Sequence, residues 1–485
     1  MNWILLYQVL YLFILTIVCL RIIYDTRNNT KSLAYLLFAV FVPFLGMAFY
    51  FVFGVNYRNR KMYSKKLIVN DEQANKLRDI IIEYSENTFE ESDRSVKSFK
   101  ELANLLLKDN LSPLTSNNKV KLLVNGENKF PELINALKEA KDHIHLEYYI
   151  YEDDAIGKLI QSVLVQKANE GVTVRFIYDD YGSRSIRKTL VPEMQSKGIK
   201  AFPFFKIRFI TFANRLNYRN HRKIIVIDGK TAFIGGINIS DRYINDPKDS
   251  KKLFWRDTHL RIDGPGVQNL QHLFLCDWNF CADSKLEPDE TFFPPLTKMP
   301  ALDDKIVQIA SSGPDSHTPA ILYSILQAIN LATEEIIIST PYFIPNESLL
   351  DALCVASLGG IKIKLLVPLK SDSSFIDHAV RSYYLEILNA GIEIYQYSKG
   401  FMHAKTMVCD RKIAMIGTSN MDIRSFDLNF EVNAIVYDKQ IANELHSIFI
   451  DDLKDSVKLD LITWTKRPRY KKLIENAVRL VSPLL

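Results

Sequence analysis

The chain has 485 residues, of which 47% are hydrophobic, so it is long enough for more than one domain with a large apolar core. Its 61 basic and 56 acidic residues leave a net charge of only +5, and this balance does not require a nucleic-acid partner. The five cysteines form no Cys-x-x-Cys pair, which argues against a disulfide scaffold or a zinc knuckle and fits a reducing compartment.

Two uncharged apolar runs, at residues 3–20 and 33–55, are each long enough to cross a bilayer as a helix. Together they predict a transmembrane hairpin over residues 1–56. The segment after the second run is strongly basic, whereas the loop between the runs carries fewer basic residues. Because positive charge favours the cytoplasmic side, we expect everything after residue 56 to lie in the cytoplasm.

The rest of the chain reads as a connector followed by a duplicated α/β unit. Residues 57–115 show helix-period apolar spacing and predict a charged helical connector. Strand-type runs then alternate with amphipathic helical runs, which predicts α/β layers with a largely parallel sheet. The order returns later, where GVTVRF matches GIKIKL and KGIKAF matches AGIEIY. This repeat predicts a first half at 116–290 and a second half at 303–455, joined by a proline-rich linker at 291–302.

Both halves carry the pattern His-x-Lys-x4-Asp, as HRKIIVID and HAKTMVCD, followed by the matching tails AFIGGINISDR and AMIGTSNMDIR. Within each copy, the His and Lys stand two residues apart in a strand-like run, so their side chains point to the same face. The Asp ends this run, where we expect it to fix the turn rather than touch a substrate. The doubled pattern supplies six candidate catalytic residues: His221, Lys223, Asp228, His403, Lys405 and Asp410.

An imidazole beside an ammonium group suits displacement at a phosphodiester. Such a reaction needs a nucleophile in line with the leaving oxygen, a proton for that oxygen and positive charge on the non-bridging oxygens. One histidine can attack phosphorus while the other moves the proton, and the lysines supply the charge. The sequence has no cluster with metal-ligand spacing, so we expect neither a metal nor a cofactor. A single copy would suit a solvated hairpin, but two copies at matching places favour catalysis.

With its doubled motif, the chain resembles the phospholipase D superfamily. Its flanking segments resemble bacterial cardiolipin synthases of the two-motif type. These segments are FVPFLGMAFYFVFGVNYRNRK, FWRDTHLRIDGPGV, STPYFIP, GFMHAKT and GTSNMDIRSFDLNFEV. The resemblance implies two phospholipase D-like α/β/α sandwich halves packed around one active site. It also implies a multi-pass protein of the bacterial inner or plasma membrane.

The resemblance implies substrate-site roles for four more residues. Asn238 and Asn420, in the tails of the two motifs, would contact the substrate phosphate. Glu431 would orient His403, and Asp257 would serve the first-half histidine in the same way. The first copy departs from symmetry here, because it has Asp where the second has Glu. Sequence does not fix which of the two histidines attacks, and we favour the one in the first half.

The implied reaction is reversible phosphatidyl transfer. One phosphatidylglycerol would form a phosphohistidine enzyme and release glycerol, and a second would attack it to give cardiolipin. Water must be excluded, because it would yield phosphatidic acid instead. The expected partners are phosphatidylglycerol and anionic membrane lipids. A basic, aromatic insert at 204–220 and a basic tail at 456–485 with Trp464 and Tyr470 fit such lipids.

Three other functions are consistent with parts of this pattern. A hydrolytic membrane phospholipase D would use the same residues with water as the acceptor. A membrane-tethered nuclease also belongs to the superfamily, but the modest net charge and the apolar runs argue against it. A non-catalytic binder of anionic lipids would not need two complete motifs.

Overall fold

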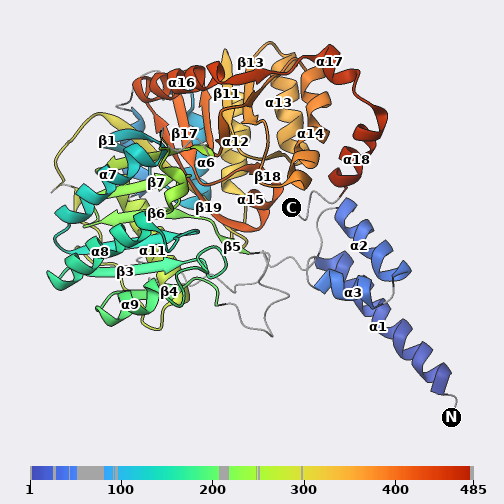
Figure 1. Cartoon of the computed structure of the whole chain (residues 1–485), viewed down its shortest axis with the longest axis horizontal. Coiled ribbons are helices and arrows are strands. Elements are labelled where there is room, and N and C mark those ends of the chain that lie inside the picture. Colours follow the sequence, from blue (N-terminus) through green and yellow to red (C-terminus); the bar gives the residue numbers. More distant parts are fainter. Residues whose placement is uncertain are drawn as a thin grey trace.

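The computed structural model describes residues 3–25, 29–42, 44–51, 81–90, 92, 97–206, 218–246, 248, 252–296 and 299–480. Parts of the predicted second span, the connector and the insert therefore lie outside the described residues. In Figure 1 the two halves of the catalytic body lie side by side, and α1 projects away from them.

The N-terminal segment forms one long helix and two shorter ones. Helix α1 (Trp3–Asp25) is the single helix among the described ranges that is long and apolar enough to cross a membrane. The second predicted span is interrupted, because α2 (Asn29–Phe41) ends before α3 (Leu45–Phe49) begins. Phe44 between them has a φ of 61°, and the sequence places Pro43 at the break, where a helix would need a backbone N–H. The described residues thus contain one candidate span where two were predicted, and part of the second predicted span lies outside them.

A buried apolar cluster links these helices to the catalytic body. It contains Val18 and Ile22 of α1, Tyr50 after α3, and Phe204 and Phe430 of the body. Because Phe430 directly precedes Glu431, the cluster connects the candidate membrane anchor to the neighbourhood of the predicted site.

The two halves share one 16-stranded sheet and confirm the internal duplication. The first half has the order β1 (Thr115–Val124), β9 (Thr258–Asp263), β7 (Thr231–Gly235), β6 (Lys223–Ile227), β2 (His143–Tyr148), β3 (Thr173–Tyr178) and β4 (Lys200–Pro203). The second half has the matching order β10 (Lys305–Ser312), β19 (Asn429–Tyr437), β17 (Ile413–Gly417), β16 (Thr406–Cys409), β11 (Glu335–Ser339), β13 (Lys362–Pro368) and β14 (Glu393–Tyr397), with β20 (Ser456–Lys458) at its edge. Strands β1 and β10 pair antiparallel, so the two orders run outward from this central pair.

The prediction of a largely parallel sheet is wrong. Within the main run of the sheet, only β2, β3 and β4 and their counterparts β11, β13 and β14 are parallel neighbours. These are the strands joined by crossover helices. The motif strands β6 and β16 instead turn back directly into β7 and β17, and such short turns join antiparallel strands.

Helices cover both faces of the sheet, as the predicted α/β/α layers require. One face carries α7 (Asn125–Glu139), α8 (Ala155–Asn169), α9 (Leu190–Ser196), α12 (Ala320–Leu331), α13 (Glu347–Leu358) and α14 (Ser374–Asn389). The other face carries α11 (Val267–Cys281) and α16 (Lys439–Lys454), over one apolar cluster that contains residues of both halves. Helix α6 (Lys100–Asn110), from the connector, packs into the core of the second half.

The motif aspartates end the motif strands in matching turns. Asp228 and Gly229 have φ values of 52° and 62°, and Asp410 and Arg411 both have 51°. Two successive positive φ values are typical of a type I′ hairpin turn. The carboxylates accept hydrogen bonds from the backbone N–H groups of Lys141, Asp142 and His143 (to Asp228) and of Thr333, Glu334 and Glu335 (to Asp410). Each aspartate therefore ties its hairpin to the start of the neighbouring strand, at the far end of the motif strand from the His and Lys.

This role predicts that Asp410→Ala destabilises the fold. Four hydrogen bonds to one carboxylate are lost, including that of the Thr333 hydroxyl at 2.7 Å, so the free energy of unfolding should fall by roughly 2–4 kcal/mol. Thermal unfolding in detergent measures the change. The exposed Asp451→Ala is the matched control, with an expected change within about 0.5 kcal/mol. If Asp410→Ala keeps the melting temperature of the wild type but loses activity, Asp410 has a catalytic role instead of a structural one.

Candidate active site

Two short strand pairs join the halves around the motif histidines. Each pair is parallel and brings the residues before a motif histidine of one half beside the residues before a carboxylate of the other. The pairs are β5 (Arg219–Asn220) with β19, and β15 (Gly400–Met402) with β8 (Phe254–Arg256).

The backbone repeats this exchange at the histidines themselves. The N–H of His221 donates to the carbonyl of Phe430 at 3.0 Å, and the N–H of His403 donates to the carbonyl of Arg256 at 2.7 Å. Each histidine is thus fixed against the residue that directly precedes the other half's carboxylate.

The side chains form two crossed pairs. The Nδ1 atom of His221 lies 2.9 and 3.0 Å from the carboxylate oxygens of Glu431. The Nδ1 atom of His403 lies 2.6 Å from Oδ2 of Asp257. The predicted pairing of Glu431 with His403 and of Asp257 with His221 is therefore wrong. Because the halves meet across β1 and β10, the carboxylate strand of one half lies beside the motif histidine of the other.

Asp257 and Glu431 occupy equivalent positions despite their different lengths. Each stands two residues before the partner of a motif-tail glycine, since Gly235 pairs with His259 and Gly417 pairs with Asn433. The tails of the two motifs differ in a way that accommodates the different lengths of the Asp257 and Glu431 side chains. A Cβ at Gly236 would lie 2.2 Å from Oδ1 of Asp257, so glycine makes room for that carboxylate. Its counterpart Thr418 instead donates its hydroxyl to Glu431 at 2.5 Å.

The lysines lie beneath the histidines. Nζ of Lys223 donates to the carbonyl of His221 at 2.8 Å. Nζ of Lys405 donates to the carbonyl of His403 and lies 3.1 Å from its Nδ1 atom. Burial lowers the pKa of Lys223 to about 7 and that of Lys405 to about 8, in spite of the nearby carboxylates.

Burial also sets the charge of the two pairs. It lowers the pKa of His221 to about 4 and that of His403 to about 3, against the opposing pull of the carboxylates. The lysine charges and the hydrogen bonds that the carboxylates accept outweigh burial at Asp257 and Glu431 and lower the pKa values of both groups. Each pair is thus a neutral imidazole whose Nδ1–H donates to a carboxylate. This leaves Nε2 of each ring as the basic nitrogen.

The predicted asparagines lie in the buried tails, and Asn238 is connected to an imidazole through one residue. The side-chain N–H of Asn238 donates to the hydroxyl of Tyr243 at 2.7 Å, and this hydroxyl lies 3.5 Å from Nδ1 of His403. The side-chain N–H of Asn420 donates to Asp422 at 3.0 Å. Of the ten predicted residues, the two motif aspartates alone are drawn away from the site to serve the turns.

Aromatic rings and two arginines complete the site, and no spacing pattern predicted them. The ring of Tyr149 lies edge-on to His221 at 4.8 Å between centroids, and Trp255 lies 5.3 Å from His403. Behind the carboxylates, Arg222 donates to the carbonyl of Glu431 at 3.4 Å, and Arg256 donates to that of Asp257 at 2.7 Å. These arginines are anchored by ion pairs to Asp277 and Asp452. Their only sequence signal is adjacency to the motif, in HRK and WRD.

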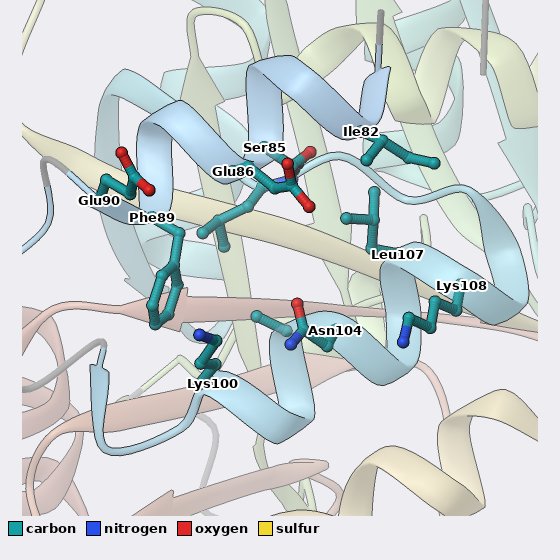
Figure 2. A pocket seen from close by; sticks show the side chains of 11 residues that line it. Ile82, Ser85, Glu86, Phe89, Glu90, Lys100, Asn104, Leu107 and Lys108 are labelled. Atoms are coloured by element: carbon teal, nitrogen blue, oxygen red, sulfur yellow. Dashed lines mark hydrogen bonds between the residues drawn. The ribbon is translucent and has the colours of Figure 1, made fainter. Parts of the chain in front are cut away.

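No group of three His, Cys, Asp or Glu side chains that could hold a metal ion occurs within the described part of the chain. A cavity of about 440 Å³ lies away from the paired histidines, between the helix at 81–90 and α6. Figure 2 shows its mixed lining, which includes Phe89, Glu86 and Lys100. None of the motif residues contributes to it.

The family model and the relatives that match this chain over most of its length are described as cardiolipin synthases. The family described as cardiolipin synthase, PLD-like domain, matches residues 133–258 and 325–453, and the phospholipase D-nuclease N-terminal family matches residues 13–54. Cardiolipin synthase 2 of Bacillus anthracis is 40% identical over 95% of this chain and 88% of its own length. The major cardiolipin synthase ClsA of Bacillus subtilis (strain 168) is 39% identical over 95% of each chain. The crystal structure of phosphatidylserine synthase from Haemophilus influenzae Rd KW20 shares the fold, with a TM-score of 0.60 at 13% identity, over 81% of this chain and 100% of that one.

The crossed pairing predicts which residues are energetically coupled. In a double-mutant cycle, His221→Ala and Glu431→Ala should show an interaction energy of about 1–3 kcal/mol, because either single change leaves a buried partner unpaired. Denaturant unfolding of the four proteins in detergent measures it. The cycle of His403→Ala with Glu431→Ala is the control and should give less than about 0.5 kcal/mol. A larger interaction energy for His403 with Glu431 than for His221 with Glu431 would contradict the crossed pairing.

The lowered lysine pKa values predict an unusually early alkaline limit to activity. Lysine binds phosphate only when protonated, so kcat/KM should fall as pH rises through about 7 to 8, where Lys223 and Lys405 titrate. Lys223→Arg keeps its charge and should move the first fall from about pH 7 to about pH 8. The fall in kcat/KM is measured with phosphatidylglycerol vesicles between pH 5 and 10, roughly the range around these lysine pKa values. If kcat/KM falls at the same pH in Lys223→Arg as in the wild type, a group other than Lys223 titrates there.

Proposed function

The chain belongs to the cardiolipin synthase family of the phospholipase D superfamily and is a phosphatidyltransferase of cardiolipin synthesis, and we propose that it joins two phosphatidylglycerol molecules through a phosphohistidine. The observation that carries this proposal is the pair of crossed histidine–carboxylate contacts in one buried site. Two basic Nε2 atoms supplied by opposite halves suit a displacement that needs a nucleophile on one side of phosphorus and a proton donor on the other.

In the first step Nε2 of His221 attacks the phosphorus of phosphatidylglycerol. The bond from phosphorus to the glycerol oxygen breaks, and His403, which takes up a proton at Nε2 when the anionic substrate binds, gives that oxygen its proton, so that glycerol leaves. Lys223 and Lys405 stabilise the charge on the non-bridging oxygens. Glu431 accepts the Nδ1–H of His221 at 2.9 Å and so stabilises the positive ring that the phosphoryl bond creates.

In the second step a hydroxyl of another phosphatidylglycerol attacks the same phosphorus. Neutral His403 takes the hydroxyl proton, the phosphorus–nitrogen bond to His221 breaks, and cardiolipin is formed. Asp257 holds the ring of His403 through Nδ1 at 2.6 Å, which keeps Nε2 available for the proton in both steps. Protons and phosphodiester bonds balance over the cycle, and no nucleotide is consumed. Asn238 and Asn420 would contact the phosphate from the motif tails.

We propose that the chain is embedded in the bacterial plasma membrane, with α1 as its anchor and residues 33–55 as a second pass. The apolar length of α1 supports the anchor. The basic residues after residue 56 support a cytoplasmic position for the catalytic halves. In this arrangement the aromatic side chains around the site, such as Tyr149 and Trp255, would face a lipid substrate and help to exclude water.

The test uses phosphatidylglycerol labelled at its phosphate, in vesicles that hold the full chain. The wild type should form cardiolipin and glycerol and carry an acid-labile label. His221→Ala should abolish both, whereas His403→Ala should keep label on the protein while cardiolipin formation falls by roughly 10²–10⁴-fold. Mass spectrometry of the lipids and acid treatment of the protein are the measurements. Label in both variants would contradict the mechanism, and phosphatidic acid without cardiolipin would favour a hydrolase.

A further inference from the structure

The C-terminal helix α18 (Arg469–Arg479) presents an apolar face to the outside. Tyr470, Leu473 and Ile474 recur at the i, i+3 and i+4 spacing of one helix face, and their exposed fractions are 61%, 71% and 44%. Leu480, just after the helix, continues this face and is 82% exposed. A surface helix of a globular protein normally turns such a face inward.

The face of α18 that packs on the body is mixed, because Val478 packs against the apolar core of the second half beside several polar contacts. Glu475 is 3% exposed and accepts hydrogen bonds from Arg467 at 2.7 and 2.9 Å. Arg479 lies 3.4 Å from Glu386 of α14 and over the ring of Tyr383. These contacts together hold the helix with Tyr470, Leu473 and Ile474 exposed on its outer face.

The neighbouring helix α17 (Leu461–Thr465) adds to this surface but not in the way the sequence suggested. Ile462 is 63% exposed. Trp464, expected at a membrane interface, is instead buried, because it packs against Tyr384 and beneath the guanidinium of Arg467. Of the two aromatic residues noted in the tail, Tyr470 alone is exposed.

Positive charge surrounds the apolar side chains. Lys466, Arg469 and Lys471 are exposed along α17 and α18. The one acidic residue of α18, Glu475, is buried in its ion pair. An exposed apolar strip bordered by basic residues is the composition of a helix that lies flat on an anionic bilayer, and each basic residue adds about 1 kcal/mol of attraction in such a position.

We propose that this surface, which we call the α18 face (Ile462, Tyr470, Leu473, Ile474 and Leu480 with Lys466, Arg469 and Lys471), docks on the anionic surface of the lipid bilayer. Two further observations favour lipid over a second copy of the chain. Like charges on two copies would repel, and five apolar side chains are few for a stable dimer interface of about 1,200–2,000 Å². Figure 1 shows α18 at the end of the body toward which the N-terminal helices lie.

The consequence is a second attachment of the catalytic body to the membrane. A chain attached only through its N-terminal segment has its membrane contacts at one place. A contact at the α18 face would fix the tilt of the two halves and keep the site between them close to its lipid substrate. The docking does not depend on the proposed histidine chemistry, and its test has a readout other than activity.

The experiment places an environment-sensitive fluorophore at Leu473→Cys in the full chain, in vesicles of phosphatidylglycerol and phosphatidylcholine. The unsubstituted chain is carried through labelling as the blank, because it has five cysteines of its own. Leu358→Cys on α13 is the matched control, since Leu358 is 73% exposed and Leu473 is 71% exposed. Lipids brominated in their acyl chains quench only a fluorophore that enters the bilayer.

We expect a blue shift and at least twofold quenching at position 473 in anionic vesicles, and much less of both at position 358. Charge reversal by Lys466→Glu and Lys471→Glu should reduce the quenching. Equal emission at the two positions would overturn the proposal. So would a shift at 473 without quenching that depends on protein concentration, since that result means a second copy covers the face.

Discussion

The crossed contacts between histidine and carboxylate are the constraint on which the structure depends. Glu431 and Asp257 are completely buried, and a buried carboxylate is costly unless it is paired. Each finds its histidine partner in the opposite half. Neither half can therefore complete its own motif, and the folding of the two halves against each other is the same event as the assembly of the site. A duplicated chain has in this way become one enzyme rather than two linked domains.

The shared sheet delivers this exchange. Antiparallel pairing of β1 with β10 places β19, which holds Glu431, and β9, which directly follows Asp257, on either side of the centre. The short pairs of β5 with β19 and β15 with β8 then set the register to the residue. Small asymmetries are absorbed locally, because Gly236 accommodates the shorter Asp257 and Thr418 donates to the longer Glu431. The two halves therefore place their histidine–carboxylate pairs alike, while the tail residues Gly236 and Thr418 behind the carboxylates differ.

Those features of the fold and the site that depend on local sequence pattern can be predicted from the sequence. The doubled motif, the repeat order and the turn role of Asp228 and Asp410 follow from spacing. The pairing of His221 with Glu431 does not, because the two lie 210 residues apart and meet through the register between halves. The parallel sheet was overestimated because runs of apolar residues do not show whether the next strand returns by a hairpin or a crossover. Trp464 was misplaced for a related reason, since composition does not show which face of a helix packs inward.

Charge balance links the resting site to the first chemical step. With both imidazoles neutral, the ammonium groups of Lys223 and Lys405 are balanced by the carboxylates of Asp257 and Glu431. A phosphodiester brings one further negative charge into this buried space. That charge favours protonation of an adjacent imidazole, although burial lowers the pKa of His403 to about 3 before substrate arrives. In the proposed mechanism the substrate therefore creates the acid that its own leaving group requires. The same balance disfavours a charged histidine in the empty site, so that His221 keeps a free Nε2 lone pair for attack on phosphorus.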